Sequence, residues 1–206
     1  MTPHPSAAGP RRGVAALRIV VALTVLTAVV ATAVDTASRT PLLPFNFFGF
    51  FTIQGNILLA VLLLATAVTG RSLAIARGAA TGYIVVVGLV YNTLLVGLAG
   101  GVALPWANTV MHLLFPIYGL LDWILFADRP ALPWRRLWIV IVYPIVWLVV
   151  VLVRGATDGW VPYPFLDPAN GYGTVAVYVV IIAVAFLLSG ALVWALSRVR
   201  VLRPTR

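Results

Sequence analysis

The sequence predicts an all-α, polytopic integral membrane protein with six transmembrane helices and both termini in the cytoplasm. Three observations carry this prediction. Of the 206 residues, 62% are hydrophobic and 9% are charged, whereas a typical soluble domain has about 25% charged residues. Several apolar runs approach the ~20 residues that are needed to cross ~30 Å of hydrocarbon. The arginines between these runs are also distributed unevenly from one loop to the next.

Polar or Gly/Pro-containing turns separate the apolar runs and define the six predicted spans. These spans cover residues 14–34, 47–68, 78–98, 106–126, 137–153 and 174–196. A polar tail that contains prolines covers residues 1–13 and is predicted to be disordered. The membrane domain then covers 14–197, and a basic cytoplasmic tail covers 198–206. Because the first span has a basic flank and small residues near its end, cleavage as a signal peptide is the alternative for that segment.

Arginine supplies all 14 basic side chains, and its distribution predicts the orientation of the bundle. With six spans, 12 arginines fall on the side of the two termini, and two, Arg39 and Arg154, fall on the other side. Positive charge marks the cytoplasmic face, so both termini are predicted inside. This topology accounts for the net charge of +9, and we predict no nucleic-acid partner.

Polar side chains from four spans fall at a similar depth near the outer side of the membrane. His112 lies about six residues into the fourth span, or about 9 Å below its outer end at 1.5 Å per residue. An ionisable side chain inside a span is a functional-site hypothesis. The other members of this layer are Thr52, Asn56, Tyr91, Asn92, Asn108 and, at the end of the fifth span, Arg154.

A neutral histidine is a suitable general base if a nucleophile lies within hydrogen-bonding reach. Ser189 is the one serine deep in a span, and it is predicted in the inner half of the sixth span, far from His112. Threonine is therefore the candidate nucleophile, and depth alone does not choose among Thr32, Thr52, Thr93 and Thr109. The alternative is a buried histidine that is hydrogen-bonded to Asn or Tyr across helices.

The composition argues against metal and haem sites. The chain has no cysteine and no glutamate, and His112 is the one histidine outside the N-terminal tail, so we predict no metal and no cofactor. Asp122 lies about 15 Å deeper than His112 and is predicted to pair with Arg135 or Arg136. The aromatic loop at 154–173 is predicted to lie at the membrane interface, with capping of the polar layer as the alternative.

Several short motifs resemble those of the androgen-induced-gene family, which includes the androgen-dependent regulator of tissue factor pathway inhibitor. The segment FTIQGN at 51–56 resembles the segment that carries the nucleophilic threonine of that family. Met111-His112, with Pro116 downstream, resembles the segment that carries its histidine. The pairs at 91–92 and 143–144 and the loop from Arg154 to Tyr172 look like the bacterial branch of the family.

The resemblance implies a specific chemistry. The animal members are multipass threonine hydrolases that cleave fatty acid esters of hydroxy fatty acids. Carried over to this chain, Thr52 is the nucleophile and His112 is the general base, and no metal takes part. Asn56, Asn92 and Asn108 are candidate oxyanion donors, and Tyr91 is grouped with them as a substrate-binding residue. Asp158 or Asp167 could orient His112 if the loop folds inward.

The leading functional prediction is therefore an intramembrane lipid-ester hydrolase of the bacterial cytoplasmic membrane, with a lipid as substrate and membrane lipids around it. The rival is a non-enzymatic membrane protein, either a small-molecule carrier or a scaffold, whose polar layer binds a ligand or holds helices together. The sequence does not predict the oligomeric state.

Overall fold

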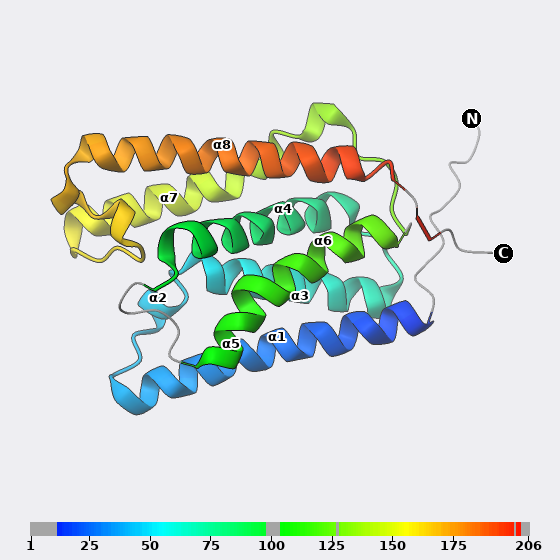
Figure 1. The fold of residues 1–206 in the computed structure, drawn as a ribbon, viewed down its shortest axis with the longest axis horizontal. Helices are drawn as coiled ribbons and strands as arrows, with labels where there is room; N and C mark the ends of the chain where they lie inside the picture. Colours follow the sequence, from blue (N-terminus) through cyan, green and yellow to red (C-terminus); the bar gives the residue numbers. More distant parts are fainter. Residues whose placement is uncertain (1–11, 98–103, 127, 200, 203–206) are drawn as a thin grey trace.

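The computed structural model describes residues 12–97, 104–126, 128–199 and 201–202. This part of the chain contains six helices that are long and apolar enough to cross a membrane, and it contains no strand (Figure 1). The predicted all-α, multipass architecture is confirmed. The spans are Arg12–Arg39, Phe51–Thr69, Ala74–Leu95, Pro105–Leu125, Trp134–Thr157 and Tyr172–Leu196.

The first two predicted spans have different ends in the structure. Helix α1 covers Arg12–Arg39, so residues 35–39, which were predicted as the start of a loop, are helical. The side chain of Arg39 reaches Asp35 at 2.7 Å, and this i,i+4 ion pair supports the last turn. A separate helix, α2, covers Pro44–Phe47, and α3 covers Phe51–Thr69. Of the predicted N-terminal tail, residues 1–11 lie outside the described residues and the last two belong to α1.

The third and fourth spans are each interrupted by a turn of π-helix, which the sequence did not predict. Helix α4 covers Ala74–Val90 and continues into the π-helical segment η1, Tyr91–Leu95. The fourth span consists of α5, the π-helical segment η2 and α6. Their bounds are Pro105–Thr109, Val110–Leu114 and Phe115–Leu125.

The last two spans are joined by the aromatic loop. A 3₁₀ turn, η3 (Trp134–Arg136), precedes α7 (Ile139–Thr157). Two further 3₁₀ turns, η4 (Pro164–Leu166) and η5 (Pro168–Asn170), lead into α8 (Tyr172–Leu196). In the predicted C-terminal tail, the N–H of Leu202 donates to the carbonyl of Leu125 at 3.0 Å, and residues 200 and 203–206 lie outside the described residues.

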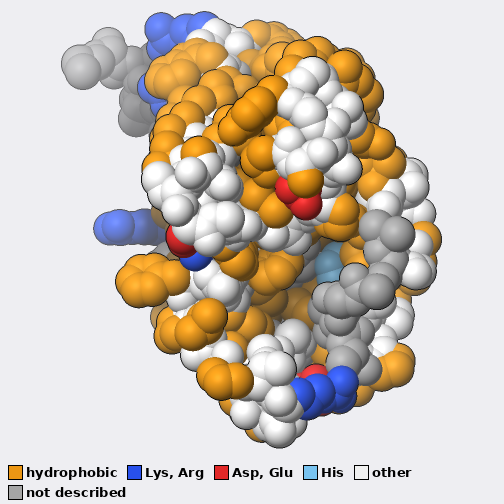
Figure 2. Space-filling view, turned by 90° about the vertical axis from the view of Figure 1, so that its left-hand side faces the viewer, with side chains coloured by type: hydrophobic (Ala, Val, Ile, Leu, Met, Phe, Trp, Pro, Cys, Tyr) orange, Lys and Arg blue, Asp and Glu red, His pale blue; other side chains and the backbone are white. Residues whose placement is uncertain are grey.

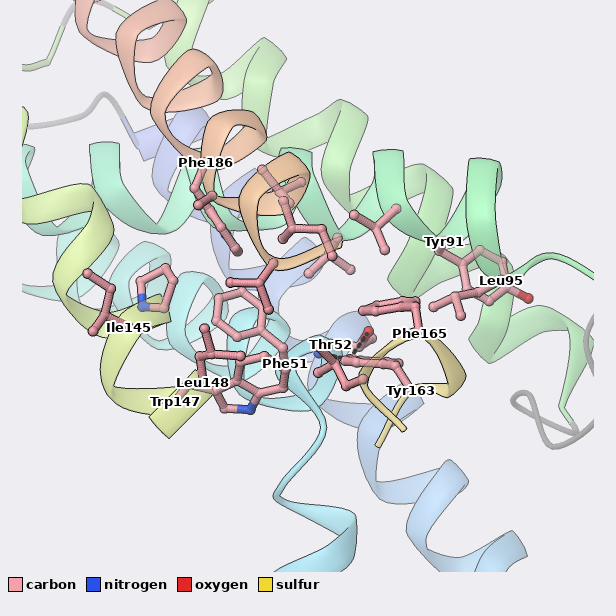
Figure 3. Close-up of a pocket in the computed structure, with 18 of the residues that line it drawn as sticks. Phe51, Thr52, Tyr91, Leu95, Ile145, Trp147, Leu148, Tyr163, Phe165 and Phe186 are labelled. Carbon is pink, nitrogen blue, oxygen red and sulfur yellow. Dashed lines mark hydrogen bonds between the residues drawn. The ribbon is translucent and has the colours of Figure 1, made fainter. Parts of the chain in front are cut away.

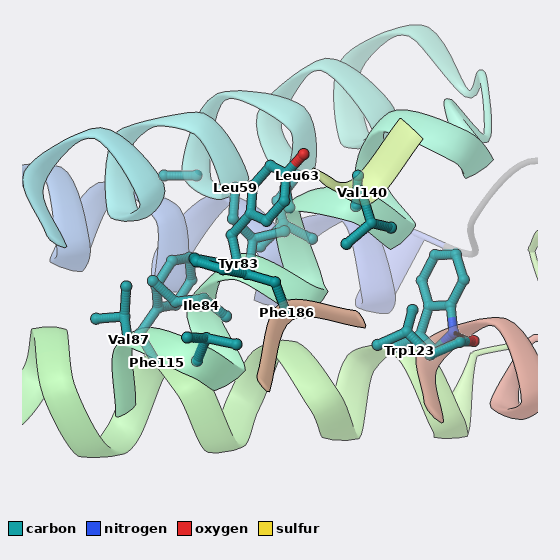
Figure 4. Packing of buried hydrophobic residues seen from close by; sticks show 14 of the residues in the cluster. Leu59, Leu63, Tyr83, Ile84, Val87, Phe115, Trp123, Val140 and Phe186 are labelled. Carbon is teal, nitrogen blue, oxygen red and sulfur yellow. Dashed lines mark hydrogen bonds between the residues drawn. The ribbon is translucent and has the colours of Figure 1, made fainter. Parts of the chain in front are cut away.

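Helix α4 lies at the centre of the bundle, between α3, α6 and α8 (Figure 1). Small residues let its neighbours approach closely, as is usual between membrane helices. A Cβ atom on Gly82 would lie 3.7 Å from the backbone of Gly190 in α8, and one on Gly88 would lie 2.9 Å from Pro116 in α6. Around α4 the buried core includes Leu59, Ile84, Phe115, Trp123 and Phe186 (Figure 4).

The two ends of the bundle have different compositions. Helix α1 begins and α8 ends at one end, which we call the termini end (Figure 1). At the opposite end, which we call the loop end, lie α2 and the loop between α7 and α8. The predicted layer around His112 lies toward the loop end, and Asp122 lies toward the termini end.

Candidate active site

A cavity of about 720 Å³ lies at the loop end of the bundle. Figure 2 views this end and shows a hollow with a histidine side chain in its depth; His112 is the one histidine of the described chain. Three of the predicted site residues, Thr52, Tyr91 and His112, line the cavity. Its other walls come from the last two turns of α1, from α2 and from the loop before η4.

Thr52 occupies the first turn of α3, next to a tyrosine from the distant aromatic loop. Its side chain is 8% exposed, and its Oγ1 lies 3.4 Å from the Oη of Tyr163. The backbone N–H of Thr52 donates to the same phenolic oxygen at 3.2 Å. The first N–H groups of a helix have no intrahelical acceptor, and Phe50 at the N-cap offers none from its side chain. Tyr163 therefore takes the place of a capping side chain.

The structure separates Thr52 from the other three candidate threonines. The hydroxyls of Thr32, Thr93 and Thr109 donate to the carbonyl four residues earlier, at 2.7–2.9 Å, as helical threonines commonly do. Thr52 begins its helix and has no such helical carbonyl behind it. Its hydroxyl is therefore the one among the four that faces a side chain rather than its own backbone.

His112 is held in a defined orientation by its own helix. Its Nδ1 lies 3.1 Å from the carbonyl oxygen of Asn108. A carbonyl only accepts, so Nδ1 carries the hydrogen and, in the neutral ring, Nε2 is left with the lone pair. The ring stacks on Tyr91, with centroids 3.7 Å apart and planes inclined by 21°. The imidazole thus has the tautomer that a general base needs at Nε2.

No acid orients His112 within the described residues. Asp158 accepts from Arg154 at 2.7 Å and from the N–H of Trp160 at 3.0 Å, and the hydrogen bond from Arg154 holds its pKa below the ordinary value. Asp167 caps η5 by accepting from the N–H of Ala169 at 2.9 Å. A backbone carbonyl takes the orienting role that the sequence analysis offered to these two aspartates.

The asparagines predicted as oxyanion donors do not line the cavity, because their amide groups are used between helices. Asn56 Nδ2 donates to the carbonyl of Thr52 at 2.8 Å and lies 3.4 Å from that of Met111. Asn108 Nδ2 donates to the Oη of Tyr91 at 2.6 Å. These side chains position Thr52 and Tyr91, and their role as oxyanion donors stays a prediction.

Asn92 joins the two π-helical segments beside the cavity. Pro116 has no N–H to donate to the carbonyl of His112, four residues earlier. Asn92 Nδ2 donates to that carbonyl at 3.0 Å and to the carbonyl of Gly88 at 2.8 Å. Turns of π-helix are frequent at functional sites, and here both such turns contribute a ring, Tyr91 and His112, to the cavity wall.

A second, narrow cavity of about 80 Å³ adjoins the first (Figure 3). It lies between α3 and α4 on one side and α7 and α8 on the other, and its walls are almost wholly apolar. Both cavities are lined by Thr52, Tyr91, Leu95 and Tyr163. Thr52 therefore lies where a large, mostly apolar cavity that also has polar and charged side chains in its wall meets an apolar slot.

The termini end contains a buried cluster of two arginines and two aspartates, which we call the ionic cluster. The Nε of Arg18 donates to Asp122 at 2.7 Å, and its Nη1 donates to Asp128. Arg77 donates to Asp122 at 3.0 Å and to Asp128 at 3.2 Å. All four side chains are at most 7% exposed. The predicted pairing of Asp122 with Arg135 or Arg136 is wrong, because arginines inside α1 and α4 are closer than those in the exposed η3 turn.

Comparison of the chain with protein-family models, with curated proteins and with solved structures finds no match. The argument for function therefore depends on the chemistry of the cavity. Sequence reasoning missed Tyr163 as part of the site, although the position of the aromatic loop after the fifth span was a signal that it could cover the polar layer.

Proposed function

We propose that this multipass membrane protein hydrolyses lipid esters, with Thr52 as nucleophile and His112 as general base. The observation that carries the proposal is that two residues with complementary features line the same cavity. One is a threonine whose hydroxyl is free of its helix backbone, and the other is a histidine whose Nε2 has the lone pair. The resemblance of 51–56 and 111–112 to a family of membrane threonine hydrolases points to the same two residues.

The proposed reaction has two steps. In the first, Oγ1 of Thr52 attacks the ester carbonyl while Nε2 of His112 takes the hydroxyl proton. The bond from the carbonyl carbon to the alcohol oxygen breaks, and the alcohol leaves with the proton from His112. In the second, His112 takes a proton from water as the water oxygen attacks the acyl-threonine carbonyl. The bond from the acyl carbon to Oγ1 then breaks, His112 returns the proton to Oγ1, and the fatty acid leaves. Neither of the two reaction steps needs a metal or a cofactor.

Groups around Thr52 could stabilise the oxyanion of each step. The N–H groups at the start of α3 have no intrahelical acceptor, and the positive end of the helix dipole favours negative charge there. Tyr163 offers a phenolic O–H at the same place. Burial raises the pKa of this phenol above its ordinary value, despite the hydrogen bond with Thr52, so Tyr163 remains a donor at neutral pH.

We infer that the loop end faces away from the cytoplasm, because 12 of the 14 arginines belong to the side of the termini. In a bacterium the cavity would then open at the outer leaflet of the cytoplasmic membrane. The chain has no cysteine, so single cysteines can test this. An impermeant maleimide should label Asn170→Cys but not Arg136→Cys in intact cells, and the reverse pattern would overturn the orientation.

One observation favours a binding protein without chemistry. Among the described residues the hydroxyl of Thr52 meets Tyr163 and not His112. General-base hydrogen bonds often tighten only when substrate binds, so this does not decide between the two. A carrier for amphiphiles would use the same cavity and would need neither the Thr52 hydroxyl nor the Nε2 lone pair.

Hydrolysis of fatty-acyl esters by the purified protein separates these functions. We expect release of fatty acid by the wild type and a loss of about 100-fold or more in Thr52→Ala and in His112→Gln, since general-base catalysis alone contributes 10²–10⁴-fold. Thr66→Ala is the matched control, because Thr66 is a buried threonine of the same helix whose hydroxyl donates to Leu62 at 2.8 Å. Equal turnover in Thr52→Ala and Thr66→Ala would remove the hydrolase proposal.

A further inference from the structure

The apolar slot beside Thr52 has the dimensions and walls of a site for a single hydrocarbon chain. Its volume is about 80 Å³, and a water-sized group needs about 10–15 Å³ of such volume. The slot therefore has room for several groups of that size. The far wall is formed by side chains of α7 and α8, among them Ile145, Leu148, Val179, Ile182, Ala183 and Phe186.

Aromatic rings restrict the width of the slot. Phe51, Trp147, Phe165 and Phe186 line it (Figure 3), and Trp147 is fixed by a hydrogen bond from its Nε1 to the carbonyl of Gly49 at 2.8 Å. The rings of Phe51 and Trp147 pack edge to face, with centroids 5.2 Å apart. Interiors of this kind are packed too closely to admit a fused ring system without rearrangement. An unbranched chain needs the least displacement.

The slot ends at the candidate nucleophile. Thr52 and Tyr163 belong to the walls of both cavities, so a molecule that occupies both cavities at once would lie against Thr52. The large cavity has polar and charged side chains that the slot lacks, including Thr36, Asp35 and Arg39 of α1. The slot therefore suits a purely apolar chain, and the large cavity on the α1 side of Thr52 suits a portion of the molecule that is larger and carries polar groups.

We propose that the slot between α7 and α8 binds the unbranched acyl chain of the substrate, and that the alcohol portion of the ester occupies the large cavity. This inference rests on the proposed function for the position of the scissile bond, which it places at Thr52. Binding of the chain itself needs no chemistry, so the free fatty acid should occupy the same slot. The substrate class is then an ester of one straight acyl chain with a more polar alcohol.

Photo-crosslinking tests the inference independently of hydrolysis. The probe is palmitic acid with a diazirine in the half of the chain nearest the carboxyl group, added to the Thr52→Ala protein in phosphatidylcholine nanodiscs. We expect crosslinks on the slot-facing residues of α7 and α8 that excess palmitate competes away. Crosslinks on lipid-facing positions alone, or crosslinks that palmitate does not reduce, would overturn the inference.

Two neighbouring residues of α8 provide a matched pair of variants. Ala183 lines the slot, whereas Val184 is 47% exposed on the outer face. Ala183→Phe should fill the slot and reduce competable crosslinking about tenfold, the factor that ~1.4 kcal/mol of lost binding produces. Val184→Phe should leave it unchanged. If Ala183→Phe does not fold, the smaller Ala183→Leu should give a partial loss, and no loss in any folded slot variant would contradict the proposal.

The outcomes also distinguish this inference from the proposed function. If palmitate crosslinks specifically to the slot but the protein hydrolyses no ester, the acyl-chain site is supported and the proposed hydrolase function is contradicted. If hydrolysis depends on Thr52 but is the same in a folded Ala183→Phe variant as in the wild type, the hydrolase function is supported and the acyl-chain site is contradicted.

Discussion

The bundle contains two polar layers, one at each end, and they differ in how their polar groups are used. At the termini end, Arg18 and Arg77 donate to both Asp122 and Asp128, and all four side chains are buried. At the loop end, Thr52 and His112 line an open cavity. The Thr52 hydroxyl lies beside the Oη of Tyr163 rather than a helix carbonyl, and the bond of His112 to its own helix uses Nδ1 and not Nε2.

This difference in hydrogen bonding separates intramembrane polar residues that stabilise the fold from those that form a candidate site. Buried charges are tolerated when they are paired and hydrogen-bonded, and the ionic cluster meets this condition. It joins α1, α4 and α6, and each of its four side chains is hydrogen-bonded within the cluster. In the loop-end layer the asparagines join helices, whereas among the described residues the hydroxyl of Thr52 meets only the phenol of Tyr163 and the Nε2 of His112 is not used by its own helix.

Each end of the bundle also contains buried polar atoms that have no hydrogen-bond partner in the described part of the chain. Among the described residues, the buried amide oxygens of Asn56 and Asn108 have no hydrogen-bond partner, and both belong to the loop-end layer. At the termini end the same holds for Nε of Arg129, although its guanidinium lies 4.2 Å from the ring centroid of Trp123. The ionic cluster itself has no such atom.

The largest expected effect is on the ionic cluster. Arg18→Met leaves Asp122 and Asp128 with Arg77 alone, and breaking a buried pair in this way typically costs about 3–5 kcal/mol. The matched control is Arg39→Met, which breaks an i,i+4 pair whose arginine is 58% exposed and which should cost roughly 0.5 kcal/mol or less. Unfolding by SDS in mixed micelles measures the free energy of unfolding of both variants. Similar losses in the two would show that the buried ionic cluster is no more important for stability than an exposed ion pair.

An intermediate effect is expected for Tyr163→Phe, which keeps the ring and removes the oxygen that accepts from the N–H of Thr52. Loss of a capping interaction typically costs about 1 kcal/mol, and ester hydrolysis should fall because a donor beside Thr52 is lost. The control is Tyr143→Phe, which removes a hydrogen bond to the half-buried Gln54, because neither residue lines either cavity. If Tyr143→Phe reduced the rate of hydrolysis as much as Tyr163→Phe, the hydroxyl of Tyr163 would have no specific role in catalysis.

The smallest effect concerns pH. Burial raises the pKa of Asp128, but the hydrogen bond from Arg18 and the charges of Arg77 and Arg18 lower it more, so the folded-state pKa lies below the ordinary value. The resulting stabilisation is complete above the unfolded pKa of about 3.9 and is lost as the pH falls through the folded pKa. Thermal unfolding between neutral and acid pH should therefore show a shallower acid loss in Asp128→Asn than in the wild type. If the unfolding temperatures of the wild type and of Asp128→Asn fell in parallel with pH, Asp128 would not contribute to the loss of stability at acid pH.

The sequence predicted the spans because hydropathy and helix length are set by the membrane, and it predicted the depth of Thr52, Tyr91 and His112 because depth follows from position along a span. It did not predict which arginines meet Asp122. Arg77 was assigned to a loop, and pairing across helices depends on helix rotation, which hydropathy does not report. The π-helical turns and the contact of Tyr163 with Thr52, 111 residues away in sequence, depend on packing in the same way.

Fluorophosphonate labelling of the purified protein in detergent tests the central claim most directly, with the modified residue identified by mass spectrometry. We predict a covalent adduct on Thr52 in the wild type, its loss in Thr52→Ala and in His112→Gln, and its retention in Thr66→Ala, which removes a buried hydroxyl of the same helix that donates to Leu62. A folded wild type without an adduct on Thr52, or one that is labelled equally well in His112→Gln, would contradict the claim that these two residues form an activated pair.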